Sequence, residues 1–232
     1  MRFLGKIRGS TSAVRVAPFA IFVLLTAAQG KFGAASAYWF YLAKTLVGLW
    51  LILEIRPSVS EMRWAFSWEA VLVGVGVFAL WVGLSGEWTT QNSLWEKLGF
   101  SHPPEKFAAA WNPNGHFGSV LAWLFIVTRI LGSTFIVPQI EEVFYRSFLY
   151  RYLATQNFLS VPLDKFLPIP FLVTAVVFGI SHNEWLAGIL CGAAFQWLVL
   201  RKNRLGDAMT AHAITNFLLG IWVVTRGAWQ FW

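Results

Sequence analysis

The amino-acid sequence predicts an all-α, polytopic membrane protein. Of its 232 residues, 57% are hydrophobic and only 12% are charged, and the mean hydropathy is +0.58. A soluble domain is on average about 45–50% apolar and about 25% charged, so this chain has too few charges to coat a soluble surface. The 14 Trp residues agree with this prediction, because indole rings favour the membrane–water interface.

Apolar runs along the chain predict about seven or eight transmembrane helices. A span needs roughly 20 mostly apolar residues, with about 17 to 25 tolerated. The segment 139–153 mixes acids and arginines with aromatic residues, so we expect an additional tilted span there or a helix that dips partway into the bilayer. The candidate runs are residues 16–29, 37–53, 70–85, 117–137, 166–181, 185–200 and 208–224.

The distribution of basic residues predicts the orientation of these helices. The net charge is +7, but Lys and Arg lie in short clusters between apolar runs, as at Arg201, Lys202 and Arg204. This pattern is typical of membrane topology rather than of a surface that binds nucleic acid. Because Lys and Arg favour cytoplasmic loops, we expect a cytoplasmic N-terminus. The 86–116 loop, which contains His102 and His116 as ordinary polar residues, is then extracytoplasmic.

Ionisable side chains near apolar runs mark the candidate site, because a bare charge within the bilayer is costly. Pro138 followed by Glu141 and Glu142 is a helix-start signal. Glu142 and Arg146 are four residues apart and share a helix face, so we expect an ion pair. Glu141 points about 100° away and stays free to take or give a proton. The alternative is an interfacial amphipathic helix with acids at its N-terminal end.

Two further polar groups lie on later apolar runs. His182 ends a run and follows Phe178 by one helical turn; its alternative is a helix-end or hydrogen-bonded core residue. His212 and Asn216 are four residues apart, so both project from one helix face. Both side chains can donate N–H groups to a developing oxyanion. Their alternative role is hydrogen bonding between helices, which is common for His and Asn in membranes.

The ordered motifs Glu-Glu-x-x-x-Arg, Phe-x-x-x-His and His-x-x-x-Asn resemble the CPBP family, the CAAX-protease and bacteriocin-processing (ABI) group. The resemblance covers residues 137–217. The run 141–153 is similar to bacterial CAAX-protease-related proteins associated with exosortase systems. The resemblance therefore implies an integral protein of the bacterial cytoplasmic membrane, with residues 117–232 as the catalytic helical core. Residues 1–116 would supply N-terminal transmembrane helices and the long extracytoplasmic loop.

The resemblance also implies a function and a role for each candidate residue. The function is an intramembrane endopeptidase that hydrolyses a peptide bond of a membrane-associated protein or lipopeptide within the bilayer. Glu142 would be the supporting acid and Arg146 its charge partner. The implied catalytic residues are Glu141, which activates water, His182, which assists it, and His212 and Asn216, which stabilise the oxyanion.

No cofactor is favoured, although zinc is an alternative. A catalytic zinc site needs three protein ligands and an open position for water, and Glu141, His182 and His212 could supply them. The sequence contains no His-Glu-x-x-His helix, which is the usual zincin arrangement, so metal-independent chemistry is the favoured interpretation. The single cysteine, Cys191, excludes an intramolecular disulfide and a cysteine-based zinc cage.

Two other classes of function compete with a peptidase. A non-catalytic scaffold or immunity-type protein would use the same polar residues to pack helices. A proton-coupled transporter would also place acids and histidines in spans, but here the candidates all fall in the last hundred residues.

Counting spans along the chain places His182 and His212 at different depths in the bilayer. A shared site therefore requires a water-filled cavity between short or tilted helices.

Overall fold

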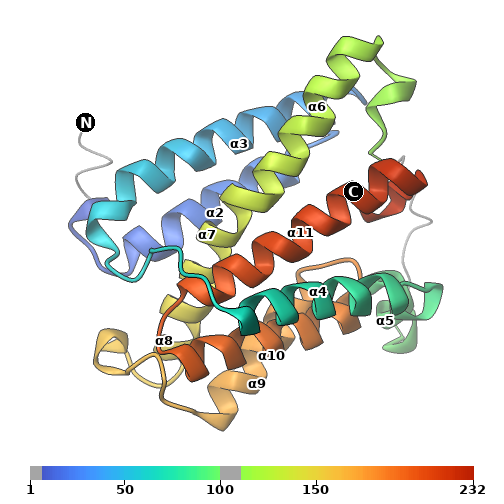
Figure 1. Ribbon diagram of the computed structural model, residues 1–232. Helices are drawn as coiled ribbons and strands as arrows, with labels where there is room; N and C mark the ends of the chain where they lie inside the picture. Colours follow the sequence, from blue (N-terminus) through green and yellow to red (C-terminus); the bar gives the residue numbers. More distant parts are fainter. Residues whose placement is uncertain (1–6, 100–110) are drawn as a thin grey trace.

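The computed structural model describes residues 7–99 and 111–232, and its regular elements are helices (Figure 1). The all-α prediction is confirmed. Among the described residues the only β-type pairing is an isolated bridge between Thr90 and Glu184. Each predicted apolar run falls on one of the longer helices. These are α2 (Ala13–Ala27), α3 (Ser36–Ile55), α4 (Trp68–Gly83), α6 (Ser119–Leu131), α9 (Pro168–Ile180), α10 (Trp185–Lys202) and α11 (Gly206–Arg226).

The predicted number of spans is too high by the criteria of length and composition. Within the described residues, three helical segments are long and apolar enough to cross a membrane, at Ser36–Ser58, Ser119–Tyr152 and Gly206–Arg226. The helices α2, α4 and α9 are apolar but shorter. Apolar runs shorter than a bilayer-spanning length can equally form buried helices of a core. Hydropathy alone could not separate these two cases.

The segment 139–153 continues the helix before it and is not a separate element. After α6 the chain passes through a π-helical turn η4 (Gly132–Ile136), α7 (Val137–Glu142), a second π-helical segment η5 (Val143–Leu149) and α8 (Tyr150–Tyr152). Together they form one 34-residue helix. Pro138 therefore does not start a new helix, as its position suggested. The wide turn of η4 precedes it and accommodates a residue that lacks a backbone N–H.

The helices alternate in direction, so that the basic clusters gather at one end of the bundle (Figure 1). At this end Lys202 of α10 binds Glu69 of α4, with 2.7 Å between Nζ and Oε1. Thr210 of α11 donates to the carbonyl oxygen of Ala65 in the loop before α4. The opposite end holds the α2–α3 turn, α5 (Gln91–Lys97) and the C-terminus.

Small residues let neighbouring helices approach closely, as is common in membrane bundles. A Cβ atom at Gly74 of α4 would lie 2.7 Å from the carbonyl oxygen of Ala211 in α11. One at Gly188 of α10 would lie 2.8 Å from the Cα atom of Gly179 in α9. The hydroxyl of Thr215 also donates to the Gly74 carbonyl oxygen at 2.9 Å. These contacts hold α11 against α4, and α9 against α10.

One carboxylate ties three segments together at the basic end. Oε1 of Glu61 accepts hydrogen bonds from Arg15 of α2 at 2.7 Å, from Arg151 of α8 at 2.7 Å and from Ser147 of η5 at 2.6 Å. Burial raises the pKa of Glu61, but the hydrogen bonds from Ser147 and Arg15 outweigh it and lower the pKa to about 2. Glu61 is therefore ionised at neutral pH and balances two nearly buried guanidinium groups.

We expect Glu61→Gln to destabilise the protein at neutral pH by about 3 kcal/mol, because it leaves Arg15 and Arg151 without a counter-charge. The folded-state pKa is lower than the unfolded value near 4.5. The contribution of Glu61 is therefore full above that value and is lost as the pH falls towards 2. Melting curves in detergent at pH 7 and pH 3 should show a difference from wild type that shrinks at low pH.

The matched control is Glu54→Gln, because Glu54 pairs with Arg8 at the surface. Exposed ion pairs contribute about 0–1 kcal/mol, so this change should scarcely alter the melting temperature. Equal effects of the two substitutions at pH 7 would contradict the role assigned to Glu61.

Candidate functional site

Glu142 of α7 lies at the centre of a buried polar cluster. Its Oε1 atom is 3.0 Å from Nδ1 of His212 on α11, and its Oε2 atom is 3.2 Å from Nε of Arg146 on η5. The side chains of Glu142 and Arg146 are fully buried. The ion pair expected from their spacing is therefore present, although its geometry is too poor for a hydrogen bond. One carboxylate thus holds both an arginine and a histidine.

The ring of His212 is held by an aromatic neighbour and by a carboxylate. It stacks on Phe195 of α10, with 5.0 Å between ring centroids and 29° between planes, and only 4% of the residue is exposed. Glu142 occupies its Nδ1 atom. A histidine whose one nitrogen is bound by a carboxylate presents the other in a defined direction. In this protein the other nitrogen, Nε2, faces Glu141 with 4.0 Å between Nε2 and Oε2.

Glu141 contributes a carboxylate oxygen that has neither a hydrogen bond nor an arginine partner among the described residues. Its Oε2 atom is buried and has no hydrogen-bond partner among the described residues. The 4.0 Å separation from His212 is too long for a hydrogen bond. A water molecule about 2.8 Å from both atoms would fit this separation. Buried polar atoms without a partner are uncommon and require an explanation. A bound water or a substrate group is the simplest one.

Arg146 supplies the positive charge of the cluster. Its Nη2 atom donates to the Gly192 carbonyl oxygen at 3.1 Å, and its guanidinium lies 4.5 Å from the centroid of the Phe178 ring. The cluster contains two carboxylates but a single guanidinium. Because an uncompensated charge in a buried site is costly, one additional proton held by Glu141 or His212 would balance it. A proton shared between these two residues is what acid–base catalysis uses.

His182 lies next to the cluster and not inside it. It follows the end of α9, and its Nδ1 atom is 2.7 Å from the carbonyl oxygen of Phe178. The Phe178 ring is 4.6 Å from the His182 ring and 6.1 Å from the His212 ring. Both histidine rings therefore neighbour the same aromatic side chain, and α9 ends at Ile180 after 13 residues, just before His182. Within the described residues, no direct contact joins His182 to Glu141 or His212.

Asn216 forms a hydrogen bond between helices. Its Nδ2 atom donates to the carbonyl oxygen of Ser133 in η4 at 2.8 Å. This bond corresponds to the alternative role that the sequence left open for the residue. It also ties α11 to the first π-helical turn, one turn of α11 after His212. A role of Asn216 in stabilising an oxyanion stays a prediction, and it would use the second amide N–H group.

The three residues considered as zinc ligands are not arranged as a metal site. Across residues 7–99 and 111–232, no group of three or more His, Cys, Asp or Glu side chains is placed to hold a metal ion. Glu141 and His212 approach each other, whereas Nδ1 of His182 is 2.7 Å from the carbonyl oxygen of Phe178. The residues present therefore do not fit a zinc site, and no chemical step is assigned to a metal here.

Sequence reasoning missed three residues that shape the cluster: Phe195, the carbonyl of Gly192 and the carbonyl of Ser133. Gly188 and Gly192 form a small-x-x-x-small pattern, which indicates close helix packing in membranes. This pattern could have pointed to the face of α10 on which Phe195 also lies. The role of the Ser133 carbonyl carried no signal in the sequence, because it depends on the π-helical turn.

Of the two predicted loop histidines, the structure describes His116, which is not part of the cluster. Its ring lies beside that of Tyr38 at the opposite end of the bundle, with 5.4 Å between ring centroids and 53° between the planes. His102 lies outside the described residues. The isolated Lys44 of α3 donates to Thr26 at 3.0 Å and lies over the rings of Phe22 and Tyr41.

Comparison with known proteins links this cluster to one family. The family model described as Type II CAAX prenyl endopeptidase Rce1-like matches residues 123–218. This segment contains α7, α9, α10 and the part of α11 with His212 and Asn216. No curated protein and no solved structure matched the chain. The segment 123–218, with its buried Glu-Glu, Arg and His cluster, is therefore similar to the Rce1-like family of type II CAAX prenyl endopeptidases.

Proposed function

We propose that the protein hydrolyses a peptide bond of a membrane-associated protein or lipopeptide with a water held between Glu141 and His212. The observation that supports this function is the partnerless Oε2 atom of Glu141, which faces Nε2 of His212 at 4.0 Å. The family of segment 123–218 supports the class of reaction, a peptidase acting in a membrane.

In the proposed reaction Glu141 is the general base. Its carboxylate takes a proton from the water, whose oxygen forms a bond with the carbonyl carbon of the peptide. The carbonyl oxygen gains negative charge and accepts a hydrogen bond from the protonated Nε2 atom of His212. Glu141 then delivers its proton to the peptide nitrogen as the carbon–nitrogen bond breaks. Preorganised donors of this kind stabilise an oxyanion strongly in a buried site.

The remaining residues position these two. Glu142 accepts from Nδ1 of His212, so that Nε2 points to Glu141, and Arg146 compensates the charge of Glu142. His182 would contact the substrate or the water from the other side of Phe178. Asn216 keeps α11 in register with η4 and has one amide N–H group free for the oxyanion.

The location and the substrate belong to the same proposal. The basic clusters at the end that contains Arg15, Arg151 and Lys202 support a cytoplasmic N-terminus, since Lys and Arg favour that side. The site lies in the segment 117–232, and the helices of 1–116 would support it. A bacterial cytoplasmic membrane and an association with exosortase systems stay predictions from the resemblance.

The alternative function, a non-catalytic scaffold or immunity-type protein, also has support in the structure. The bond from Asn216 to Ser133 and the buried pair of Glu142 and Arg146 both join structural elements. However, a scaffold would leave the unpaired oxygen of Glu141 unexplained. The two functions differ in what substitution of Glu141 should do.

We expect Glu141→Gln to reduce cleavage at least about a hundredfold, because it removes the base and keeps the volume. Its melting temperature should stay close to that of wild type, since Oε2 of Glu141 has no hydrogen-bond partner to lose. The measurement is cleavage of a quenched lipopeptide library by purified protein, together with melting curves in the same detergent.

The matched substitution is Glu142→Gln on the neighbouring residue. It should lower both cleavage and melting temperature, because it leaves Arg146 and His212 without a buried counter-charge. Equal loss of melting temperature in both variants, with no cleavage by wild type, would support the scaffold instead.

Chelators should leave cleavage unchanged after prolonged dialysis, because the proposed steps use only protein side chains. Metal content measured by mass spectrometry should not correlate with specific activity across preparations. Activity that disappears on chelation and returns with zinc alone would contradict the assignment of Glu141 and His212 as a metal-independent pair.

A further inference from the structure

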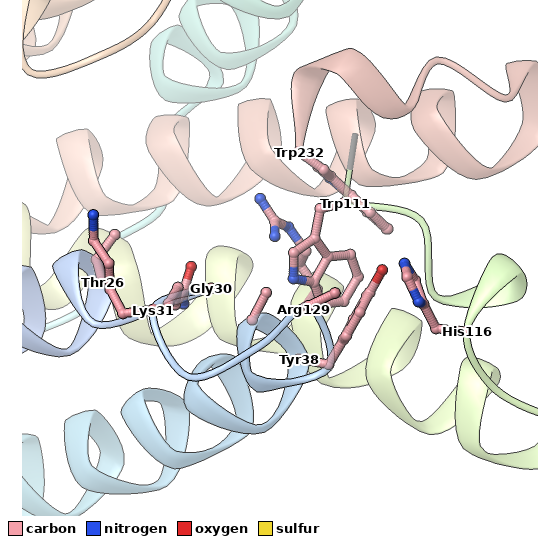
Figure 2. Close-up of a pocket in the computed structure, with 11 residues that line it drawn as sticks. Thr26, Gly30, Lys31, Tyr38, Trp111, His116, Arg129 and Trp232 are labelled. Atoms are coloured by element: carbon pink, nitrogen blue, oxygen red, sulfur yellow. The ribbon is translucent and has the colours of Figure 1, made fainter. Parts of the chain in front are cut away.

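A cavity of about 550 Å³ lies at the end of the bundle opposite the basic clusters. In Figure 2, Thr26 and Lys31 lie on one side of it, and Tyr38, Trp111, His116 and Trp232 gather on the other. The α2–α3 turn, the start of α3, the segment before α6, the last turn of α6 with Arg129, and the C-terminal Trp232 line it. None of the proposed catalytic residues lines this cavity.

Arg129 of α6 is the central charged group of the cavity. Its guanidinium carbon lies 4.5 Å from the centroid of Trp111, 4.7 Å from that of Tyr41 and 5.3 Å from that of Trp232. Aromatic faces attract a cation but do not satisfy its five N–H donors. In the part of the chain that the structure describes, no carboxylate forms an ion pair with Arg129.

Two neutral donors of the same cavity also lack acceptors. Nε2 of Gln29 and Nε1 of Trp111 are buried without a hydrogen-bond partner among the described residues. The ammonium group of Lys31 adds a second positive charge, and the described lining includes no Asp or Glu. Unpartnered donors and cations around one space fit a ligand that offers several acceptor oxygens and negative charge.

The surroundings of the cavity place it at the level of lipid headgroups. Trp39, near the start of α3, is 48% exposed, and Trp123, near the start of α6, is 54% exposed. Phe32 in the α2–α3 turn is 74% exposed and stacks on Phe40. Exposed indole rings concentrate at the membrane–water interface. A ligand that enters this cavity therefore comes from the headgroup region.

We propose that this cavity binds the phosphate of an anionic phospholipid. The guanidinium of Arg129 would donate to the phosphate oxygens in the bidentate manner that suits this group. Trp111 and Gln29 would donate to further oxygens, and Lys31 would compensate the charge at the mouth of the cavity. The acyl chains would lie along the exposed apolar faces of α3 and α6. The site is independent of the proposed peptidase cluster.

The test measures thermal stabilisation by dioleoylphosphatidylglycerol added to purified protein in a neutral maltoside detergent. We expect Arg129→Gln to raise the half-saturating lipid concentration about ten- to hundredfold, as for loss of a charged hydrogen bond. Lys31→Gln changes an exposed residue and should raise the half-saturating lipid concentration severalfold. If Arg129→Gln does not fold, this second variant tests the proposal. Arg226→Gln should have no effect, because Arg226 lies over Trp222 outside the cavity.

Further arms identify the source of the anion. Inorganic phosphate should stabilise the protein only at a far higher concentration than the lipid does. If phosphate stabilised the protein at the same concentration as the lipid, the cavity would be a site for the free anion and not for a phospholipid. Equal half-saturating lipid concentrations for wild type and both cavity variants would overturn the proposal. It would also be overturned if a peptide with a free C-terminal carboxylate stabilised the protein while the lipid and the amidated peptide did not.

Discussion

The arrangement of the candidate site depends on the buried carboxylate of Glu142. It holds Arg146 at one oxygen and His212 at the other, so a single acid connects the long α6–α8 helix with α11. Breaking a buried pair of this kind is costly, since it leaves charges without partners. The orientation of His212, and with it the direction in which Nε2 meets Glu141, follows from this one contact. Glu141 itself joins no helices in this way, and its Oε2 atom has no hydrogen-bond partner among the described residues.

Two features of the backbone make this contact sterically feasible. The π-helical segments η4 and η5 flank α7 and change the direction of side chains around the two acids, and such segments are frequent at functional sites. Close approach at Gly192, whose carbonyl accepts from Arg146, brings α10 and Phe195 against His212. The polar cluster therefore lies among aromatic rings that exclude bulk water and strengthen its electrostatic interactions. The two ends of the bundle balance buried positive charge differently. Glu61 neutralises arginines at one end, whereas Arg129 at the other end lies over aromatic rings and forms no ion pair among residues 7–99 and 111–232.

Much of the fold and part of the site could be predicted from local sequence. The period of 3.6 residues places Glu142 and Arg146 on one face, and their ion pair is present. Hydropathy located the helices, but the number of spans was too high, because a buried helix and a membrane span have similar composition. Pro138 was misread as a helix start, since the preceding π-helical turn has no clear sequence signal. The grouping of His182 with Glu141 stays a prediction, because the rings of both His182 and His212 neighbour Phe178 but no hydrogen bond or ion pair links His182 to Glu141 among the described residues.

The sequence by itself determined the helical, apolar character of the chain and the identity of the ionisable residues on its helices, because both follow from composition and short-range periodicity. Only the tertiary structure decided which of these residues meet. Glu142 and His212 are seventy residues apart in the chain, and Asn216 pairs with a carbonyl that a local π turn exposes. The cavity around Arg129 likewise joins the α2–α3 turn, α6 and the C-terminus. Such contacts depend on helix packing between distant segments, which no local pattern encodes.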